Sequence, residues 1–373
     1  SHIFSKLNID LDLDGFIDSK LNFFLEKVSM DTYLSIFDGI LLTDKLFAND
    51  IKDHSTLTSG FDLNLNSENS SFKGGVYVYE SLQTSKNSDR FEYVLPYYNY
   101  SHSLYSDING SVNFNSQGNN TISNTNQLKS SITNNINYTT NGFETDKGFV
   151  NNFGVFLRNT NHYGKNKIGY RSSPRSEILN IYEFNSSLPL LKEDKTNLNY
   201  LIPKISFRIN PSDMKDYSEN GNIITADNVF SIDRYGFNDS FESGKSLTLG
   251  LDYKKEKKTD PEKYIEFKLA TILRDVPEYK IPRSSSAQGK TSNIFGSIEN
   301  KFSENIKFDY KFSLDNNLND LEYNDFTTEI SLNNFITEFS FLEANGEVGD
   351  TNYLENTTQI NIDENNTLKF KTR

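Results

Sequence analysis

The sequence predicts an all-β protein, namely a large antiparallel transmembrane β-barrel of roughly 16–18 strands that is present in part. We expect an open C-shaped sheet, or one whose two ends are forced together with poor register. Three observations lead to this fold class. Apolar and polar residues alternate over long runs, turn-forming clusters separate the runs, and the composition combines few apolar residues with many aromatic ones. Of the 373 residues, 35% are hydrophobic and 13% are aromatic, with 21 Tyr, 29 Phe and no Trp. A disordered chain would be poor in aromatic residues, so the composition instead fits a sheet with one apolar and one hydrated face.

Alternation of apolar and polar residues is the main signal along the chain. It is clear in four runs, at residues 7–13, 246–253, 265–270 and 306–315. Successive side chains of a strand point to opposite faces of the sheet, so each run predicts a strand with one apolar and one polar face. No stretch of similar length has apolar residues at the helical spacing of three and four, and we therefore expect no long helix.

The two faces of these strands have different expected surroundings. In a transmembrane barrel the apolar face contacts lipid and the polar face lines the lumen. The side chains expected to face lipid are Leu247, Leu249, Leu251, Phe308, Tyr310 and Phe312. The side chains expected to face the lumen are Thr248, Asp252, Lys307, Asp309 and Lys311. In a soluble sandwich the apolar set would instead be buried between two sheets.

Clusters of Asn, Asp, Gly and Ser separate the runs and predict the connections, because these residues favour tight turns. The longest loops are expected at residues 159–176, 210–229 and 276–290. Short turns at one end of the strands and long loops at the other are typical of a transmembrane barrel. The Asn-rich tract at residues 113–141, which includes a turn cluster at 115–126, is expected to hold one weak strand flanked by loops.

The charge and the spacing of reactive residues exclude several functions. The formal net charge is −13, whereas nucleic-acid binding requires clustered Lys and Arg, so no nucleic-acid partner is expected. The chain has no cysteine, and its four histidines (His2, His54, His102 and His162) have no metal-binding spacing. It also lacks a Gly-x-Ser-x-Gly elbow and a Gly-rich phosphate loop before a helix. We therefore expect no enzyme, no cofactor and no metal site.

Two segments differ from the generic strand pattern. The first contains Asp31, Thr32, Tyr33 and Leu34, where an Asp-Thr turn interrupts a strand. The second, at residues 229–236, contains Asp233, Arg234 and Gly236. An Asp-Arg pair beside a glycine occurs in catalytic and phosphate-reading sites. More often it marks a loop that a bidentate hydrogen bond fixes, with the glycine in a conformation barred to other residues. We expect this structural role.

These segments, together with two strands that contain a proline, resemble the LptD family of lipopolysaccharide-assembly proteins. Residues 229–236 and the alternating strand that follows are similar to the family's Asp-Arg-aromatic loop. Residues 29–34 are similar to its Ser-Asp-Asp-Thr-Tyr motif, with Met30 in place of the first Asp. Residues 90–100, with Pro96, and residues 201–207, with Pro203, resemble two strands of its barrel. The four segments occur in the order of the family, between about residue 29 and residue 254. The positions that carry the resemblance are Asp31, Thr32, Tyr33, Leu34, Pro96, Pro203, Asp233, Arg234 and Gly236.

The resemblance implies a translocon component that inserts lipopolysaccharide into the outer leaflet of the Gram-negative outer membrane. The sugars would pass through the hydrated lumen while the acyl chains enter the outer leaflet, without bond-making chemistry. The implied partners are lipopolysaccharide, outer-membrane lipid, a plug lipoprotein of the LptE type and the periplasmic Lpt bridge, which the family's N-terminal domain contacts.

The resemblance also implies that the chain is a fragment. Residues 1–373 would form one partial barrel domain, without the family's N-terminal periplasmic domain and without its terminal barrel strands. The cysteines that link the two domains in some relatives are absent.

Two other classes of protein fit the residue pattern. One is a general porin or receptor-type barrel, which the terminal strands of the full-length chain would distinguish. The other is a surface-exposed β-rich adhesin or solenoid without membrane insertion, whose apolar faces would not form one belt.

Overall fold

Strands are the main elements of the computed structural model, which describes residues 2–36, 55–83, 90–167, 170, 172–237, 240–303, 305–362 and 366–373. The described strands are β1 (His2–Asp10), β2 (Asp18–Val28), β3 (Thr56–Asn66), β4 (Ser70–Ser81), β5 (Phe91–Asp107), β6 (Gly110–Ser123), β7 (Gln127–Thr140), β8 (Phe143–Glu144), β9 (Val150–Lys165), β10 (Arg175–Ser187), β11 (Leu190–Glu193), β12 (Asn197–Asn210), β13 (Gly244–Lys257), β14 (Asp260–Arg274), β15 (Ile294–Ser303), β16 (Ile306–Leu314), β17 (Leu321–Leu332), β18 (Phe335–Ala344), β19 (Thr351–Asn361) and β20 (Thr367–Thr372). The described helical segments are short, namely α1 (Tyr33–Ile36) and the 3-10 helix η2 (Arg283–Ser285).

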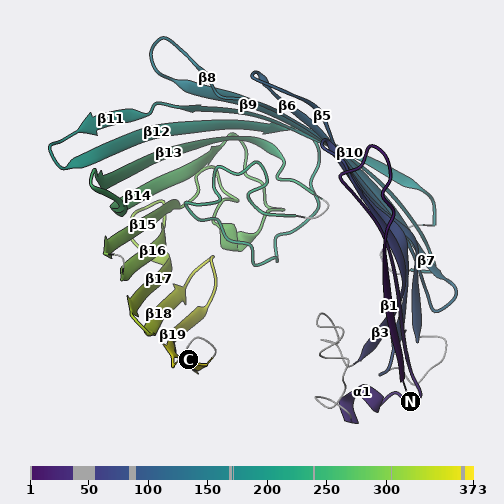
Figure 1. The fold of residues 1–373 in the computed structure, drawn as a ribbon. Helices are drawn as coiled ribbons and strands as arrows, with labels where there is room; N and C mark the ends of the chain where they lie inside the picture. Colours follow the sequence, from purple (N-terminus) through teal and green to yellow (C-terminus); the bar gives the residue numbers. More distant parts are fainter. Residues whose placement is uncertain are drawn as a thin grey trace. The chain divides into compact units, whose positions relative to one another are not determined.

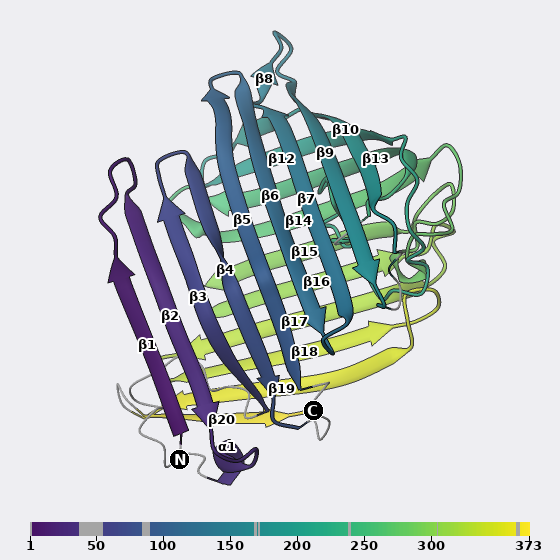
Figure 2. The same cartoon turned by 90° about the vertical axis from the view of Figure 1, so that its right-hand side faces the viewer.

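The strands form an antiparallel meander in which each strand pairs with its neighbour in the chain (Figures 1 and 2). The short strands β8 and β11 are additions, because β7 also pairs with β9 and β10 also pairs with β12. The predicted all-β antiparallel fold is therefore confirmed. The described residues contain twenty strands, and without β8 and β11, which are two and four residues long, eighteen remain.

The chain divides into two compact units, each containing part of the meander. The first unit comprises Ser1–Tyr138 and Phe156–Ile178, and the second comprises Thr139–Val155 and Leu179–Arg373. In the expected open sheet, β1 of the first unit and β20 of the second would not form a regular ladder with each other. This stays a prediction. No helix in the described part of the chain is long and apolar enough to cross a membrane.

Register explains why the alternating runs fold as they do. In the second unit Leu247 pairs with Phe207 of β12 and with Leu273 of β14, so apolar side chains of adjacent strands meet on one face. Cross-strand pairs of this kind are the main stabilising contacts of a sheet. A slip of one residue would move every apolar side chain to the opposite face, so the pattern specifies the register.

The Asn-rich tract was predicted wrongly, because it forms two long strands rather than one weak strand between loops. β6 and β7 cover most of residues 113–141, and the connection between them is only residues 124–126. Asn and Ser have low strand propensity, but a cross-strand hydrogen bond from Ser116 to Asn134, of 2.7 Å, joins the two strands. Such bonds let amide side chains remain in a long strand.

Two strand ends also differ from the expectation. The loop predicted to begin at Asn159 begins later, because β9 continues to Lys165. The first alternating run is shorter than predicted, since β1 ends at Asp10. Beyond it the backbone turns, with positive φ angles at Asp12 and Gly15.

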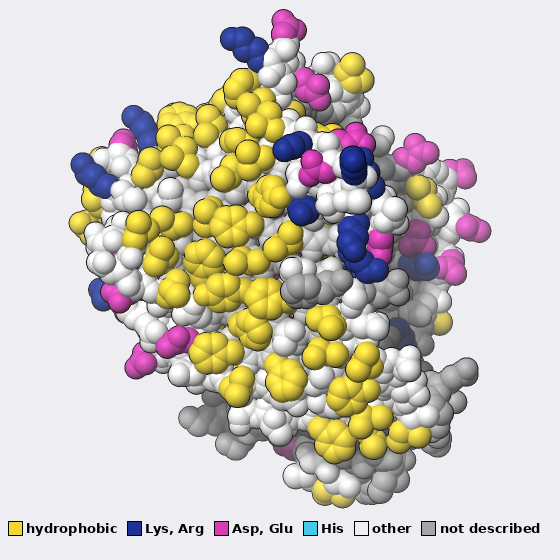
Figure 3. Space-filling view, turned by 90° about the vertical axis from the view of Figure 1, so that its left-hand side faces the viewer, with side chains coloured by type: hydrophobic (Ala, Val, Ile, Leu, Met, Phe, Trp, Pro, Cys, Tyr) yellow, Lys and Arg dark blue, Asp and Glu magenta, His cyan; other side chains and the backbone are white. Residues whose placement is uncertain are grey.

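One face of the strands in the second unit is apolar and exposed. Figure 3 shows hydrophobic side chains gathered in a broad field, with charged side chains mainly toward its borders. The exposed apolar residues include Tyr182, Phe184, Leu201, Ile205, Phe207 and Leu249. On β13, Leu249 is 38% exposed whereas the preceding Thr248 is 3% exposed. We call this apolar face the outer face and the opposite face the inner face.

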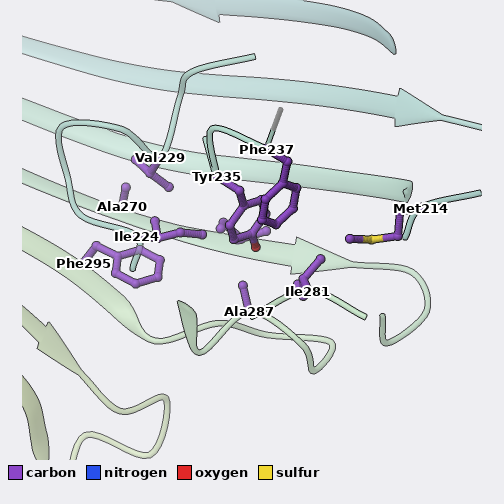
Figure 4. Packing of buried hydrophobic residues seen from close by; sticks show 10 residues of the cluster. Met214, Ile224, Val229, Tyr235, Phe237, Ala270, Ile281, Ala287 and Phe295 are labelled. Carbon is purple, nitrogen blue, oxygen red and sulfur yellow. The ribbon is translucent and has the colours of Figure 1, made fainter. Parts of the chain in front are cut away.

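The hydrophobic core of the second unit lies on the inner face. Two long connections fold against β12 to β15 there, namely residues 211–243, of which 211–237 and 240–243 are described, and residues 275–293 (Figure 1). Their buried side chains pack with strand residues in one cluster, which Figure 4 shows from close by. The cluster comprises Met214, Ile224, Val229, Tyr235, Phe237, Ala270, Ile272, Ile281, Ala287 and Phe295.

Candidate functional site

The most heavily buried charges of the second unit surround Glu242, which lies just before β13. Its carboxylate accepts hydrogen bonds from Arg234 Nε at 2.6 Å and Nη2 at 2.5 Å, a bidentate pair. Arg208 of β12 binds the same carboxylate at 3.1 Å, and Arg274 at the end of β14 also binds it. We call these four residues the Glu242 cluster. It joins the 211–243 connection to two strands of the inner face.

Further polar contacts hold Arg234 in place. Its Nη1 donates to the hydroxyl of Thr248 at 3.2 Å, and its Nη2 donates to the hydroxyl of Ser246 at 3.2 Å. The side chain of Arg234 has no exposed surface. Thr248, predicted to face the lumen, therefore lies on the inner face beneath this connection.

The electrostatics of the Glu242 cluster keep its carboxylate ionised. Burial alone would raise the pKa of Glu242, but the charges of Arg234, Arg274 and Arg208 lower it to about 2. Burial likewise opposes the charged form of Arg234, while the charge of Glu242 raises the pKa of Arg234. Ionised Glu242 therefore serves as a counter-charge to the three arginines that bind it.

The lowered pKa predicts that the 211–243 connection resists acid. Because the folded-state pKa of Glu242 lies below its ordinary value of 4.5, ionised Glu242 stabilises the fold above about pH 4.5. This stabilisation is lost as the pH falls toward about 2. We expect pepsin to leave residues 211–243 uncut between pH 5 and pH 3 and to cleave them only nearer pH 2. Cleavage that begins near pH 4 would contradict the lowered pKa.

Asp233 and Gly236 shape the turn that presents Arg234. The carboxylate of Asp233 accepts a hydrogen bond from the backbone N–H of Gly236 at 3.0 Å. Gly236 has a φ of +66°, in the left-handed region that favours glycine. The carboxylate that Arg234 binds in a bidentate pair is that of Glu242.

The other residues predicted to face the lumen also lie on the inner face. Lys311 of β16 forms an ion pair of 2.9 Å with Asp227 of the 211–243 connection. Asp252 of β13 pairs with Lys204 of β12 at 2.5 Å. Lys311 thus helps to fix the inner connection, while Asp252 and Lys204 form a charged pair on the strands. That these side chains line a lumen stays a prediction.

Lys307 and Asp309 share the inner face of β16 with Lys311. Lys307 pairs with Glu299 of β15 at 3.0 Å. The alternate residues Phe308 and Phe312 point to the outer face and are half-buried. Phe308 packs edge-on against Phe326 with ring centroids 5.1 Å apart, so neighbouring strands cover part of each ring.

In the first unit, the Asp31 segment forms a second ionic cluster. Both carboxylate oxygens of Asp31 accept hydrogen bonds from Arg90, at 3.0 and 2.6 Å. The same guanidinium binds Glu80 at 2.8 Å, and Lys27 binds Glu80 at 3.0 Å. The hydrogen bonds from Arg90 lower the pKa of Asp31. This network joins the end of β2 to the facing ends of β4 and β5.

The rest of this segment packs beneath the network. After the turn at Asp31 and Thr32 the chain enters α1, where Leu34 is 1% exposed. Leu34 packs with Val28, Leu57 and Leu82, and Tyr33 packs against this cluster. The Tyr33 hydroxyl lies 2.8 Å from Nδ1 of His2. The segment thus covers the ends of several strands.

The two prolines occupy different places in the sheet. Pro96 lies where the β4–β5 and β5–β6 ladders both shift register. A proline has no N–H for the ladder, so a bulge is a favourable place for it. Pro203 lies in the regular β12–β13 ladder opposite Leu251, on the outer face.

The partners of the signature residues were not found from the sequence. Glu242, Arg208 and Arg274 bind Arg234, and Arg90 binds Asp31, but none belongs to a recognisable motif. One signal was present, because Ala270 and Ile272 are apolar at inner-face positions of an alternating strand. An apolar pair on the polar face indicates that something covers it.

The described residues contain no group of three or more His, Cys, Asp or Glu side chains placed to hold a metal ion. Within each of the two clusters, the charged side chains bind one another and fix a loop to strands. What the arrangement provides is a sheet with an apolar outer face and a polar inner face that carries anchored connections.

Comparisons with known proteins identify a family and several similar solved structures. The family model described as "LptD: LPS transport system D" matches residues 17–373. No protein of curated function matches the chain. Among solved structures, the chain resembles the ferric enterobactin receptor of Pseudomonas aeruginosa. A double mutant of that receptor has a TM-score of 0.38 and 12% identity, over 85% of this chain and 59% of that chain. A single mutant has a TM-score of 0.37 and 11% identity, over 99% of this chain and 62% of that chain.

The family match covers almost the whole chain, including all nine signature positions. The chain spans about 60% of the length of the receptors, 59% and 62% in the two cases. Family membership also places the strands in the outer membrane, and an apolar outer face suits contact with lipid. We conclude that the chain belongs to the LptD family of the Gram-negative outer membrane.

Proposed function

We propose that this chain is the barrel part of a translocon that inserts lipopolysaccharide into the outer leaflet of the outer membrane. The observation that carries the proposal is the family match over residues 17–373. The two-faced sheet supports it physically. An apolar outer face suits lipid, and an inner face of mixed charges and amides suits the hydrated sugars of an amphiphile.

The inner face suggests how an anionic glycolipid would pass without being held tightly. The chain has a formal net charge of −13, so an anionic phosphosugar would meet little net attraction. The buried arginines of the Glu242 cluster are bound to Glu242, Glu183 and loop residues. In this proposal the signature residues Asp233, Arg234 and Gly236 position the 211–243 connection, and Asp31 to Leu34 position the end of β2.

We also propose the partners that this activity requires. Residues 1–373 would form one partial barrel domain within a longer protein. Lipopolysaccharide would arrive through a periplasmic Lpt bridge, a plug lipoprotein of the LptE type would occupy the lumen, and outer-membrane lipid would surround the outer face.

Depletion of the full-length protein in its own Gram-negative host tests the function. Newly made lipopolysaccharide should stop reaching the cell surface, and re-expression should restore delivery. Surface labelling of lipopolysaccharide sugars measures this. If delivery continues while uptake of small hydrophilic solutes falls, the chain is a porin. If the protein is soluble without detergent and absent from membranes, the adhesin alternative holds.

A further inference from the structure

A pocket on the first unit has a lining of aromatic and polar side chains. It has a cavity volume of about 620 Å³ and lies along β1 to β4. This is within the range of roughly 300–1,000 Å³ that is typical of ligand pockets. Its side chains belong mainly to the polar face of these strands, because the apolar residues Leu7, Phe23 and Phe61 pair with one another on the opposite face. Figure 2 shows the four strands side by side.

The pocket contains a wall of aromatic rings, although it lies on the polar face. Phe24 and Tyr77 have ring centroids 5.3 Å apart, and Tyr77 and Tyr79 are 6.0 Å apart. Tyr97 of β5 stacks on Tyr77 at 4.7 Å and supports it from the neighbouring strand. Offset contacts between aromatic rings hold each ring in a fixed orientation. The wall is therefore a rigid surface.

Two glycines leave the strand surface beside this aromatic wall without side chains. Gly60 pairs with Tyr77, and Gly75 pairs with Asp62. A Cβ at Gly60 would lie 2.1 Å from the carbonyl oxygen of Val76, and a Cβ at Gly75 would lie 2.1 Å from that of Phe61. No side chain fits at either position, so the space next to the Tyr77 ring stays open.

Oriented polar groups complete the pocket. Asp62 is 6% exposed, and one of its oxygens accepts hydrogen bonds from the amides of Asn22 and Asn64, each at 2.7 Å. Its other oxygen accepts the Tyr77 hydroxyl at 3.1 Å. Glu26 accepts the backbone N–H of Thr58 at 2.7 Å. These bonds fix the directions of the remaining lone pairs and amide hydrogens, which is how pockets specify orientation.

The pocket lining carries equal numbers of positively and negatively charged side chains. Lys6 and Lys73 are exposed, and Glu26 and Asp62 oppose them. A pocket for a cluster of phosphates would need an excess of cations. A sugar ring fits the lining better, because its C–H face packs on an aromatic ring while its hydroxyls bond to amides and carboxylates.

We propose that this pocket binds a pyranose ring of a glycan and serves as a holding site for the saccharide part of the transported molecule. The inference rests on the proposed function for the identity of the glycan. The recognised group is the uncharged sugar ring, and the lipid and its phosphates lie outside the pocket.

Binding to the full-length protein with its partners, purified in detergent, tests the proposal. The probe is the lipid-free oligosaccharide released from lipopolysaccharide by mild acid, and calorimetry or saturation-transfer NMR measures binding. Tyr79→Leu should weaken binding by about tenfold or more, which corresponds to ~1.4 kcal/mol. Tyr79→Phe, which keeps the ring, should bind within about twofold of the wild type. Tyr310→Leu on the outer face of β16 is the matched control and should bind as the wild type does.

Three outcomes overturn the proposal. The wild type could bind purified lipid A but not the oligosaccharide, Tyr79→Leu could bind as tightly as the wild type, or inorganic phosphate could displace the oligosaccharide. Surface delivery of lipopolysaccharide is measured independently in cells. It distinguishes failure of the pocket proposal from failure of the proposed function. If the wild type restores delivery but does not bind the oligosaccharide, the pocket proposal fails alone.

Discussion

Glu242→Ala is expected to destabilise the folded barrel by about 3–5 kcal/mol, the cost of removing one partner from a buried ion pair. The substitution leaves Arg234, Arg208 and Arg274 close together, with Glu183 near Arg208 at 3.5 Å. The side chains of the three arginines are at most 5% exposed, so water would screen their repulsion poorly. The 211–243 connection should detach from β12 and β14 before the strands separate.

Unfolding by urea in detergent, followed by heat-dependent migration on gels, measures the stability of this variant. Hydrogen exchange over residues 211–243 locates the detachment. Glu219→Ala is the matched control, since Glu219 lies in the same connection with a side chain 81% exposed and pairs with Arg283 at 3.3 Å. An exposed pair of this kind contributes at most about 1 kcal/mol. If both variants unfold at the same urea concentration, the Glu242 cluster does not hold the connection.

Phe326→Arg should lower the stability of the inserted barrel by about 2–4 kcal/mol, as an arginine facing lipid near the middle of a bilayer does. Phe326 lies near the centre of β17 and pairs with Tyr310 and Phe341. All three positions belong to the outer face. The guanidinium would therefore have hydrocarbon around it.

The neighbouring substitution Thr327→Arg is the matched control. Thr327 pairs with Asp309 on the inner face, so an arginine there would meet water and a carboxylate. We expect it to fold and insert as the wild type does. The amount of heat-modifiable protein in the outer membrane, and refolding into lipid vesicles, compare the two variants. If both variants lost the same amount of inserted protein, β17 would have no lipid-facing side. That result would support the soluble alternative.

The anchored connection was only partly predictable. Arg234 and Gly236 were identified from a short motif, and a structural role was expected for them. The residues that bind them were not identified. Arg208 and Arg274, which share the Glu242 carboxylate with Arg234, are 34 and 32 residues from Glu242 in the chain. Both arginines occupy positions where alternation predicts a hydrated polar side chain. Only the folding of the 211–243 connection against the inner face buries them.

The Asn-rich strands show the limit of propensity as a guide. Residues 113–141 contain the residues that most favour turns, and the sequence therefore indicated loops. In the structure these residues form the long strands β6 and β7, and neighbouring strands supply hydrogen-bond partners for their side chains, as Ser116 and Asn159 do for the amide of Asn134. Tertiary context decided the conformation there, as it often does in strands.

The sequence by itself determined the fold class, the two faces of the strands and the family. Period-two alternation is a local property, and a one-residue slip would expose the wrong face, so these features follow from residue order alone. The tertiary structure decided which polar residues are buried and what they bind. The Glu242 cluster, the Arg90 network and the aromatic pocket each combine residues from several strands or connections. Such groups form only when strand pairing brings distant segments of the chain together, and no local sequence pattern predicts these contacts.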